Sequence, residues 1–258
     1  QMFVIALLVS IGLSLVLGGL KHREQTFQID SASATLAVLG TLSVFTLVMP
    51  NFTKATIGAS YTPLQLFVVG FSSIALYGVF IFVQTVRHRE RFVDSNDLAT
   101  TSHAPLPPRA VATAGALLAV ALVSVIGIAE FLSDPLEQAI SAAHLERALV
   151  GIVIAAIVLM PEGLSALRAA RQNRLQSSIN MALGSALASI GLTIPTVAAV
   201  SLFTDRTLVL GLGQEDLALL VLTLFISSLT LGTGRTTLLQ GFVHLVILAV
   251  FLVLAAVP

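Results

Sequence analysis

The sequence predicts an all-α, polytopic transmembrane helix bundle, and three observations support this fold class. Of its 258 residues, 56% are hydrophobic and only 10% are charged, whereas soluble domains carry roughly 25% charged residues. The mean hydropathy is +0.98. Apolar runs long enough to cross a bilayer recur along the chain, without the two-residue alternation of barrel strands. Because backbone groups in lipid need partners within their own segment, we expect these runs to be helices.

Eight apolar runs approach the roughly 20 residues that a helix needs to span a membrane. They cover 1–20, 33–50, 64–86, 110–132, 148–167, 177–203, 216–231 and 236–257. The longest connection, 87–109, is polar and proline-rich, and we expect a flexible linker there. The predicted organisation is a single transmembrane domain, 1–258, in which the linker separates a first helical group, 1–86, from a second, 110–258.

The basic residues predict the orientation, because cytoplasmic loops are enriched in Lys and Arg. When the loops are numbered from the first span, the odd-numbered ones hold ten of the 13 basic residues: Lys21, Arg23, Arg87, Arg89, Arg91, Arg109, Arg168, Arg171, Arg174 and Arg235. The even-numbered loops hold Lys54, Arg147 and Arg206. We therefore expect the odd-numbered loops and the linker in the cytoplasm of a multi-pass protein of the bacterial inner membrane.

One short stretch occurs twice, at 10–15 (SIGLSL) and 189–194 (SIGLTI). The two copies lie on spans predicted to run in opposite directions, which is typical of inverted-repeat transporters. The alternative is chance similarity between apolar segments. The second repeat covers about 148–203. The helix that would complete the first repeat would precede Gln1, so we expect the sequence to begin inside a longer protein.

Glu162 is the strongest candidate for a functional residue. It follows the apolar run 149–160 within Pro161-Glu162-Gly163, six residues before Arg168, or roughly 9 Å along a helix. A charge at the centre of a membrane helix costs about 2.5–3.5 kcal/mol. Pro161 removes a backbone donor, and a freed carbonyl beside a carboxylate suits hard cations. Such an acid can hold a proton or a cation but not both, which antiport requires. The alternative is a protonated acid bonded to a neighbouring helix.

The following span carries hydroxyl groups near one face, at spacings of three, four or seven residues. They belong to Ser178, Ser185, Ser189, Thr193 and Thr196, with Gly184 and Gly191 close by and Pro195 permitting a break. These oxygens are candidates to complete a coordination sphere around a cation. The alternative is close packing of helices through small residues.

Three further residues are candidates for a cation or proton pathway. Asn180 offers an amide oxygen, and His244 lies inside the last span, where the alternative is a packed, hydrogen-bonded side chain. Glu130 ends the fourth span and precedes an acidic outer loop with Asp134, Glu137 and Glu146. A solvated loop is the alternative for this acidic group.

The segment from Pro161 to Pro195, with PEGLSALR followed by NMALGSALAS and TIP, resembles the second α-repeat of the bacterial calcium/proton antiporters. These form part of the cation exchanger branch of the calcium/cation antiporter superfamily. Similar stretches at 18–19, 77–85 and 233–236 extend the resemblance over nearly the whole chain. The resemblance implies that Glu162 binds the cation and the proton, and that Gly184 and Ser185 belong to a broken segment of the facing helix. The position of Ser189 is often glutamine in eukaryotic relatives, and the acidic helix of the first α-repeat is missing.

The leading hypothesis is therefore a secondary active transporter that exchanges Ca²⁺ for H⁺ through Glu162. The alternatives are a Na⁺(K⁺)/H⁺ antiporter of the same fold and a non-transporting membrane scaffold. Zero net charge gives no indication of a nucleic-acid partner, and the absence of cysteine excludes disulfides and thiolate metal sites. Without a recognisable catalytic motif, we expect neither an enzyme nor a cofactor. The expected partners are lipid, inorganic cations and protons, and the sequence leaves the oligomeric state open.

Overall fold

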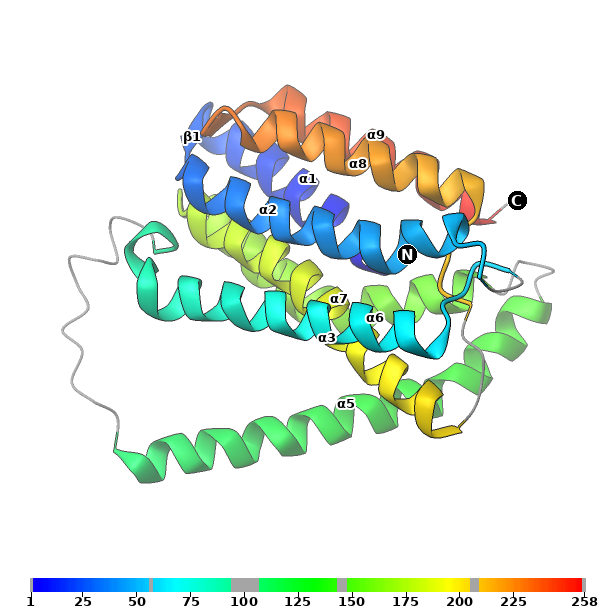
Figure 1. The fold of residues 1–258 in the computed structure, drawn as a ribbon. Helices are drawn as coiled ribbons and strands as arrows, with labels where there is room; N and C mark the ends of the chain where they lie inside the picture. Colours follow the sequence, from blue (N-terminus) through cyan, green and yellow to red (C-terminus); the bar gives the residue numbers. More distant parts are fainter. Residues whose placement is uncertain (1, 56–57, 94–106, 143–147, 205–208, 257–258) are drawn as a thin grey trace.

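The computed structural model describes residues 2–55, 58–93, 107–142, 148–204 and 209–256, and within them the chain is almost entirely helical (Figure 1). The long helices are α1 (Met2–His22), α2 (Ile29–Ser43), α3 (Pro63–Phe82), α5 (Pro108–Ala142), α6 (Ala148–Arg171), α7 (Leu175–Thr204), α8 (Gln214–Leu231) and α9 (Leu238–Ala256). Those from α2 to α9 are long and apolar enough to cross a membrane. Helix α1 occupies the place of the first predicted span, so the all-α transmembrane prediction is confirmed.

Helix α2 continues through a π-helical turn, Val44–Val48, into a 3₁₀ turn, Met49–Phe52. Pro50 explains the change, because it has no N–H to donate back along the helix. In a π turn, residue 50 would donate to the carbonyl of Phe45. The Tyr61 hydroxyl donates to that carbonyl instead. The Phe45 carbonyl therefore keeps a hydrogen-bond partner although Pro50 cannot donate to it.

Helix α3 begins with a capping box in which the Thr62 side chain accepts from the Gln65 N–H and the Gln65 side chain accepts from the Thr62 N–H. Pro63 occupies the first turn, where its missing N–H costs nothing. The helix ends in a π turn, Val83–Arg87, followed by the 3₁₀ turn Arg89–Arg91. The chain therefore enters the predicted linker in an ordered conformation.

The loops lie at two ends of the bundle, as the span count requires. At one end, strand β1 (Gln25–Thr26) of the first loop pairs antiparallel with strand β2 (Arg235–Thr236) of the seventh. At the other end, Asn51 donates from Nδ2 to the Leu212 carbonyl at 2.8 Å, so the second and sixth loops meet. The assignment of the first end to the cytoplasm stays a prediction.

The two copies of the repeated stretch lie on α1 and α7, which run in opposite directions. His22 at the end of α1 contacts Arg171, just before α7 begins. The glycine shared by the copies has the same structural role in both: a Cβ on Gly12 would lie 2.9 Å from Leu245 Cδ2 of α9, and one on Gly191 would lie 3.0 Å from the Tyr77 ring of α3. Both glycines therefore allow a close helix crossing.

The core forms where α1, α2, α7 and α8 meet, around fully buried leucines such as Leu39, Leu42, Leu183 and Leu187. Helices of both predicted groups pack together, with α3 on α7 and α9 on α1. Helix α5 lies apart from the other helices at the lower edge of Figure 1 and packs mainly against α6. Its apolar side chains are exposed, which suits a surface covered by lipid.

Two sequence-based expectations about these helices are wrong. Asp134 and Glu137 do not lie in a loop, because α5 continues to Ala142; most residues between Pro135 and the end of the helix are strong helix formers, namely Leu, Glu, Gln and Ala. Glu146 lies outside the described residues. Helices α6 and α7 are continuous through Pro161 and Pro195, and α7 is also unbroken at Gly184. Each proline removes only one helical hydrogen bond, and packing against neighbouring helices preserves the rest.

Candidate cation and proton site

Glu162 and Ser185 are brought together by the hairpin of α6 and α7. Ser185 Oγ donates a hydrogen bond to Glu162 Oε2 at 2.7 Å, and both side chains are half-buried. The oxygen–oxygen distance is in the range of a charge-assisted hydrogen bond. The carboxylate therefore faces α7, the helix that the sequence pairs with it, rather than the outside of the bundle.

Helix α1 supplies the third side of this region. A Cβ built on Gly163 would lie 4.0 Å from the Oγ of Ser10, a buried side chain of α1. The absence of a side chain at Gly163 thus allows α1 to approach α6 one residue from Glu162. Ser10 was predicted only as part of the repeat and not as a neighbour of the acid. Its place in the repeat, equivalent to that of Ser189, was the available signal.

Gly184 and Ser189 lie on α7 beside Ser185, and neither has a close partner at the acid. A Cβ on Gly184 would meet nothing within 4 Å. Ser189 is half-buried one turn beyond Ser185, and no hydrogen bond between Ser189 and Glu162 is found within the described part of the chain. The space next to Gly184 is therefore open, while the role of Ser189 stays a prediction.

Pro161 lies within α6, where its own carbonyl accepts from Ser165 Oγ at 2.9 Å. Because a proline cannot donate to the carbonyl four residues earlier, the carbonyl that loses its helical partner belongs to Ile157. This carbonyl lies one turn from Glu162. It is the backbone oxygen that the proline adds to the polar groups near the acid.

Asn180 lies away from the acid, toward the end of the bundle that holds the first and seventh loops. Its Nδ2 donates to the Phe92 carbonyl, and its Oδ1 accepts from Gln176 Nε2 at 2.9 Å. The side chain is five residues before Ser185, or roughly 7.5 Å along the helix. Its amide therefore connects α7 to the start of the linker.

His244 is fully buried in α9 at 0% exposure. Its Nδ1 donates to the Gln240 carbonyl at 2.9 Å, which leaves Nε2 to face the Ser227 hydroxyl of α8 at 3.4 Å. The His244 Cβ lies against Gly12 of α1, two residues from Ser10. Residues two apart point to nearly opposite sides of a helix, so α1 lies between His244 and Glu162.

Glu130 is exposed on α5, the helix that stands apart in Figure 1. Within the described part of the chain, no hydrogen bond or ion pair joins it to another candidate residue. Within the described residues, no group of three or more His, Asp or Glu side chains could hold a metal ion. The described site therefore combines one carboxylate with hydroxyl and carbonyl oxygens, which are ligands for hard cations.

Comparison with known proteins establishes the family. A family model described as sodium/calcium exchanger protein matches residues 113–257, more than half of the chain. The chain belongs to this family. Members of the family are cation transporters rather than enzymes. With its long apolar helices, this chain is a multi-pass protein of the bacterial inner membrane.

Three relatives of this exchanger are bacterial. The protein y4hA of Sinorhizobium fredii, provisionally named an ionic transporter, is 56% identical over 96% of the chain and 68% of its own length. The sodium-potassium/proton antiporter ChaA of Escherichia coli is 31% identical over 94% of the chain and 66% of its own length. The Ca²⁺/H⁺ antiporter ChaA of Bacillus subtilis is 24% identical over 91% of the chain and 67% of its own length. The chain thus spans about two thirds of these relatives.

Two solved structures share the fold. Native YfkE superposes with a TM-score of 0.72 at 19% identity, over 99% of the chain and 72% of YfkE. The H⁺/Ca²⁺ exchanger CAX gives a TM-score of 0.68 at 17% identity, over 98% of the chain and 63% of CAX. The prediction of a cation antiporter fold is therefore confirmed.

Proposed function

We propose that this exchanger moves a metal cation in one direction and protons in the other, with Glu162 alternately protonated and bound to the cation. The observation that supports this role is the 2.7 Å hydrogen bond between Ser185 and Glu162 on facing transmembrane helices. A carboxylate with a hydroxyl partner already in place offers two oxygen atoms from two helices. Departure of a proton would leave a negative charge that a cation compensates.

Ca²⁺ is the cargo that we propose first. Its preference for many oxygen ligands suits carboxylate, hydroxyl and carbonyl groups gathered in one place, and the relative from Bacillus subtilis is named a Ca²⁺/H⁺ antiporter. No further resident metal or cofactor is required by this proposal.

Na⁺ or K⁺ is the second candidate, and one observation favours it. The relative from Escherichia coli, at 31% identity, is named a sodium-potassium/proton antiporter.

Exchange in everted membrane vesicles tests the proposal. A respiration-driven proton gradient should be dissipated when the transported cation is added, and comparison of Ca²⁺, K⁺ and Na⁺ identifies the cargo. Glu162→Gln should abolish dissipation for every cation. Glu215→Gln is the matched control, because Glu215 is exposed in the first turn of α8. Unchanged exchange in Glu162→Gln would remove this acid from the mechanism.

The same protein in detergent distinguishes a transporter from a membrane scaffold. A cation that binds only the folded state raises the unfolding midpoint. We expect millimolar amounts of the transported cation to raise the midpoint of the wild type and not that of Glu162→Gln. An unfolding midpoint that does not change with Ca²⁺, K⁺ or Na⁺ would favour the non-transporting membrane scaffold.

A further inference from the structure

The turn between α6 and α7 is held on its α6 side by side chains of the first loop. Lys21 Nζ and His22 Nε2 both donate to the Arg171 carbonyl at 3.0 Å. Gln25 Nε2 donates to the Ala170 carbonyl at 2.9 Å and to Asn173 Oδ1 at 3.0 Å. These groups bind carbonyls in the last turn of α6, where helical partners run out; the Ala170 carbonyl also accepts from the Asn173 N–H at 3.1 Å.

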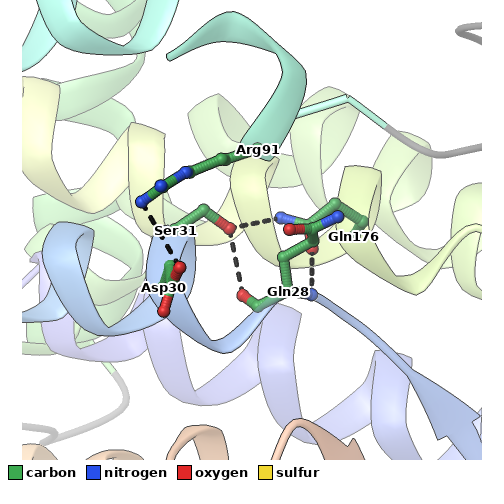
Figure 2. A network of polar contacts seen from close by, with 5 residues as sticks. All are labelled: Gln28, Asp30, Ser31, Arg91 and Gln176. Carbon is green, nitrogen blue, oxygen red and sulfur yellow. Dashed lines mark hydrogen bonds and ion pairs between the residues drawn. The ribbon is translucent and has the colours of Figure 1, made fainter.

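The α7 side of the same turn is held by Gln28, at the end of that loop, and by Ser31, in the first turn of α2, as Figure 2 shows. Gln176, in the first turn of α7, accepts the Gln28 N–H through Oε1 at 2.6 Å. Its Nε2 donates to Ser31 Oγ at 2.9 Å, and Ser31 Oγ donates to the Gln28 carbonyl at 3.1 Å. The nearby ion pair of Asp30 and Arg91, 3.3 Å long, adds the start of the linker to this network.

The buried side chain of Gln25 contributes both favourable and unfavourable terms to the stability of the fold. The side chain is 3% exposed, and a Cβ on Gly18 would lie 1.8 Å from its Oε1. That Oε1 is buried without a hydrogen-bond partner among the described residues, and an unsatisfied buried acceptor is unfavourable. An apolar side chain of similar size would avoid this penalty but would lose both hydrogen bonds that the amide donates, so the glutamine provides a specific connection to the α6–α7 turn.

We propose that Gln25 and Gln176 are positioning residues through which the segment 21–31 clamps the α6–α7 turn and sets Glu162 against Ser185. This inference rests on the proposed function of that site. Glu162 precedes Ala170 by eight residues and Ser185 follows Gln176 by nine, so the site lies roughly 12–14 Å along each helix from the clamp. Because both helices are continuous, a shift of either end at the turn displaces one site oxygen relative to the other.

The test compares Gln25→Leu and Gln176→Leu with Gln172→Leu. Gln172 is exposed in the same turn, and its side chain makes no hydrogen bond or ion pair within the described structure, so it is a matched control. Exchange in vesicles separates two effects: loss of folded protein lowers only the maximal rate, whereas displacement of Glu162 from Ser185 also raises the half-saturating cation concentration. Gln176→Glu keeps the acceptor for the Gln28 N–H and should fall between wild type and Gln176→Leu.

A second readout needs no transport. The chain contains no cysteine, so a single Ser165→Cys substitution places one thiol on the exposed side of α6 close to Glu162. The rate at which a maleimide modifies this thiol reports on the local position of α6. We expect Gln25→Leu and Gln176→Leu to raise the half-saturating cation concentration at least fivefold and to change the modification rate at least threefold. The control should stay within twofold of wild type in both measurements.

Wild-type values of both quantities in folded Gln25→Leu and Gln176→Leu would overturn the clamp. Ser31→Ala removes only a small buried hydroxyl of the network, and it decides by the same criteria if the leucine variants do not fold. If Glu162→Gln leaves exchange intact, the proposed function fails while the modification rates still test the clamp.

Discussion

The packing of α9 on α1 depends on the absence of a side chain at Gly241. A Cβ there would lie 2.8 Å from the Val16 backbone nitrogen, 2.8 Å from Val16 Cγ2 and 3.0 Å from Leu15 Cβ. Ordinary contacts are 3.4–4 Å, and a backbone nitrogen cannot rotate away. In Gly241→Ala the two helices must therefore separate by roughly 0.5–1 Å. Overpacking of this kind costs about 1–3 kcal/mol, and the gain in helix propensity recovers about 0.5–1 kcal/mol.

We therefore expect Gly241→Ala to lower the free energy of unfolding by about 1–2 kcal/mol. Reversible unfolding in mixed micelles, with SDS as denaturant, measures this difference. Gly115→Ala on the exposed helix α5 is the control, because a Cβ there meets nothing within 4 Å. It should be neutral or stabilising by about 0.5–1 kcal/mol. Equal unfolding free energies for the two variants would refute the packing argument.

Three further predictions concern single side chains. Gly184→Ala should be neutral or stabilising by about 0.5–1 kcal/mol, because a Cβ meets nothing within 4 Å. It should raise the half-saturating cation concentration several-fold by filling space beside Ser185, and an unchanged value would place Gly184 outside the site. Tyr61→Phe should lose about 1 kcal/mol of stability with the hydrogen bond to the Phe45 carbonyl. Burial raises the pKa of the Tyr61 phenol above 10.0, so the stability that the phenol contributes is present below pH 10 and disappears as pH rises beyond the pKa of the folded state. The phenylalanine variant should lack this alkaline loss of stability. An identical alkaline loss in both proteins would contradict the assignment. His244→Leu should lower stability by about 1–2 kcal/mol, because Ser227 loses its partner, without shifting the pH profile of exchange; a shifted profile would make His244 a proton carrier.

The helices could be predicted from sequence because bilayer thickness sets their length and lipid leaves the backbone no other partner. The contacts between loops at each end of the bundle agree with the predicted number of spans. The repeat was recognisable from the similarity of 10–15 and 189–194, and the structure shows that its glycines at 12 and 191 both allow a close crossing. These features depend on local composition, which a single sequence contains.

The site was only partly predictable. Helical spacing indicated the hydroxyl face of α7, and the hydrogen bond between Ser185 and Glu162 joins two of the predicted residues. Ser10 was missed because its approach to Gly163 depends on how α1 crosses α6. The amide of Asn180, a predicted pathway residue, bonds to the Phe92 carbonyl and to Gln176, and its role in a pathway stays a prediction. Side-chain chemistry alone does not reveal which end of a long helix a polar group serves.

The pairing of β1 with β2 also has a consequence for biogenesis. Gln25 aligns with Thr236, so the ribosome makes the first partner some two hundred residues before the second. Helix α1 likewise inserts into the bilayer long before α9, the helix that packs against its glycines. A nascent chain that stops short of α9 would leave both surfaces uncovered. We expect quality-control proteases of the membrane to recognise and remove such incomplete products.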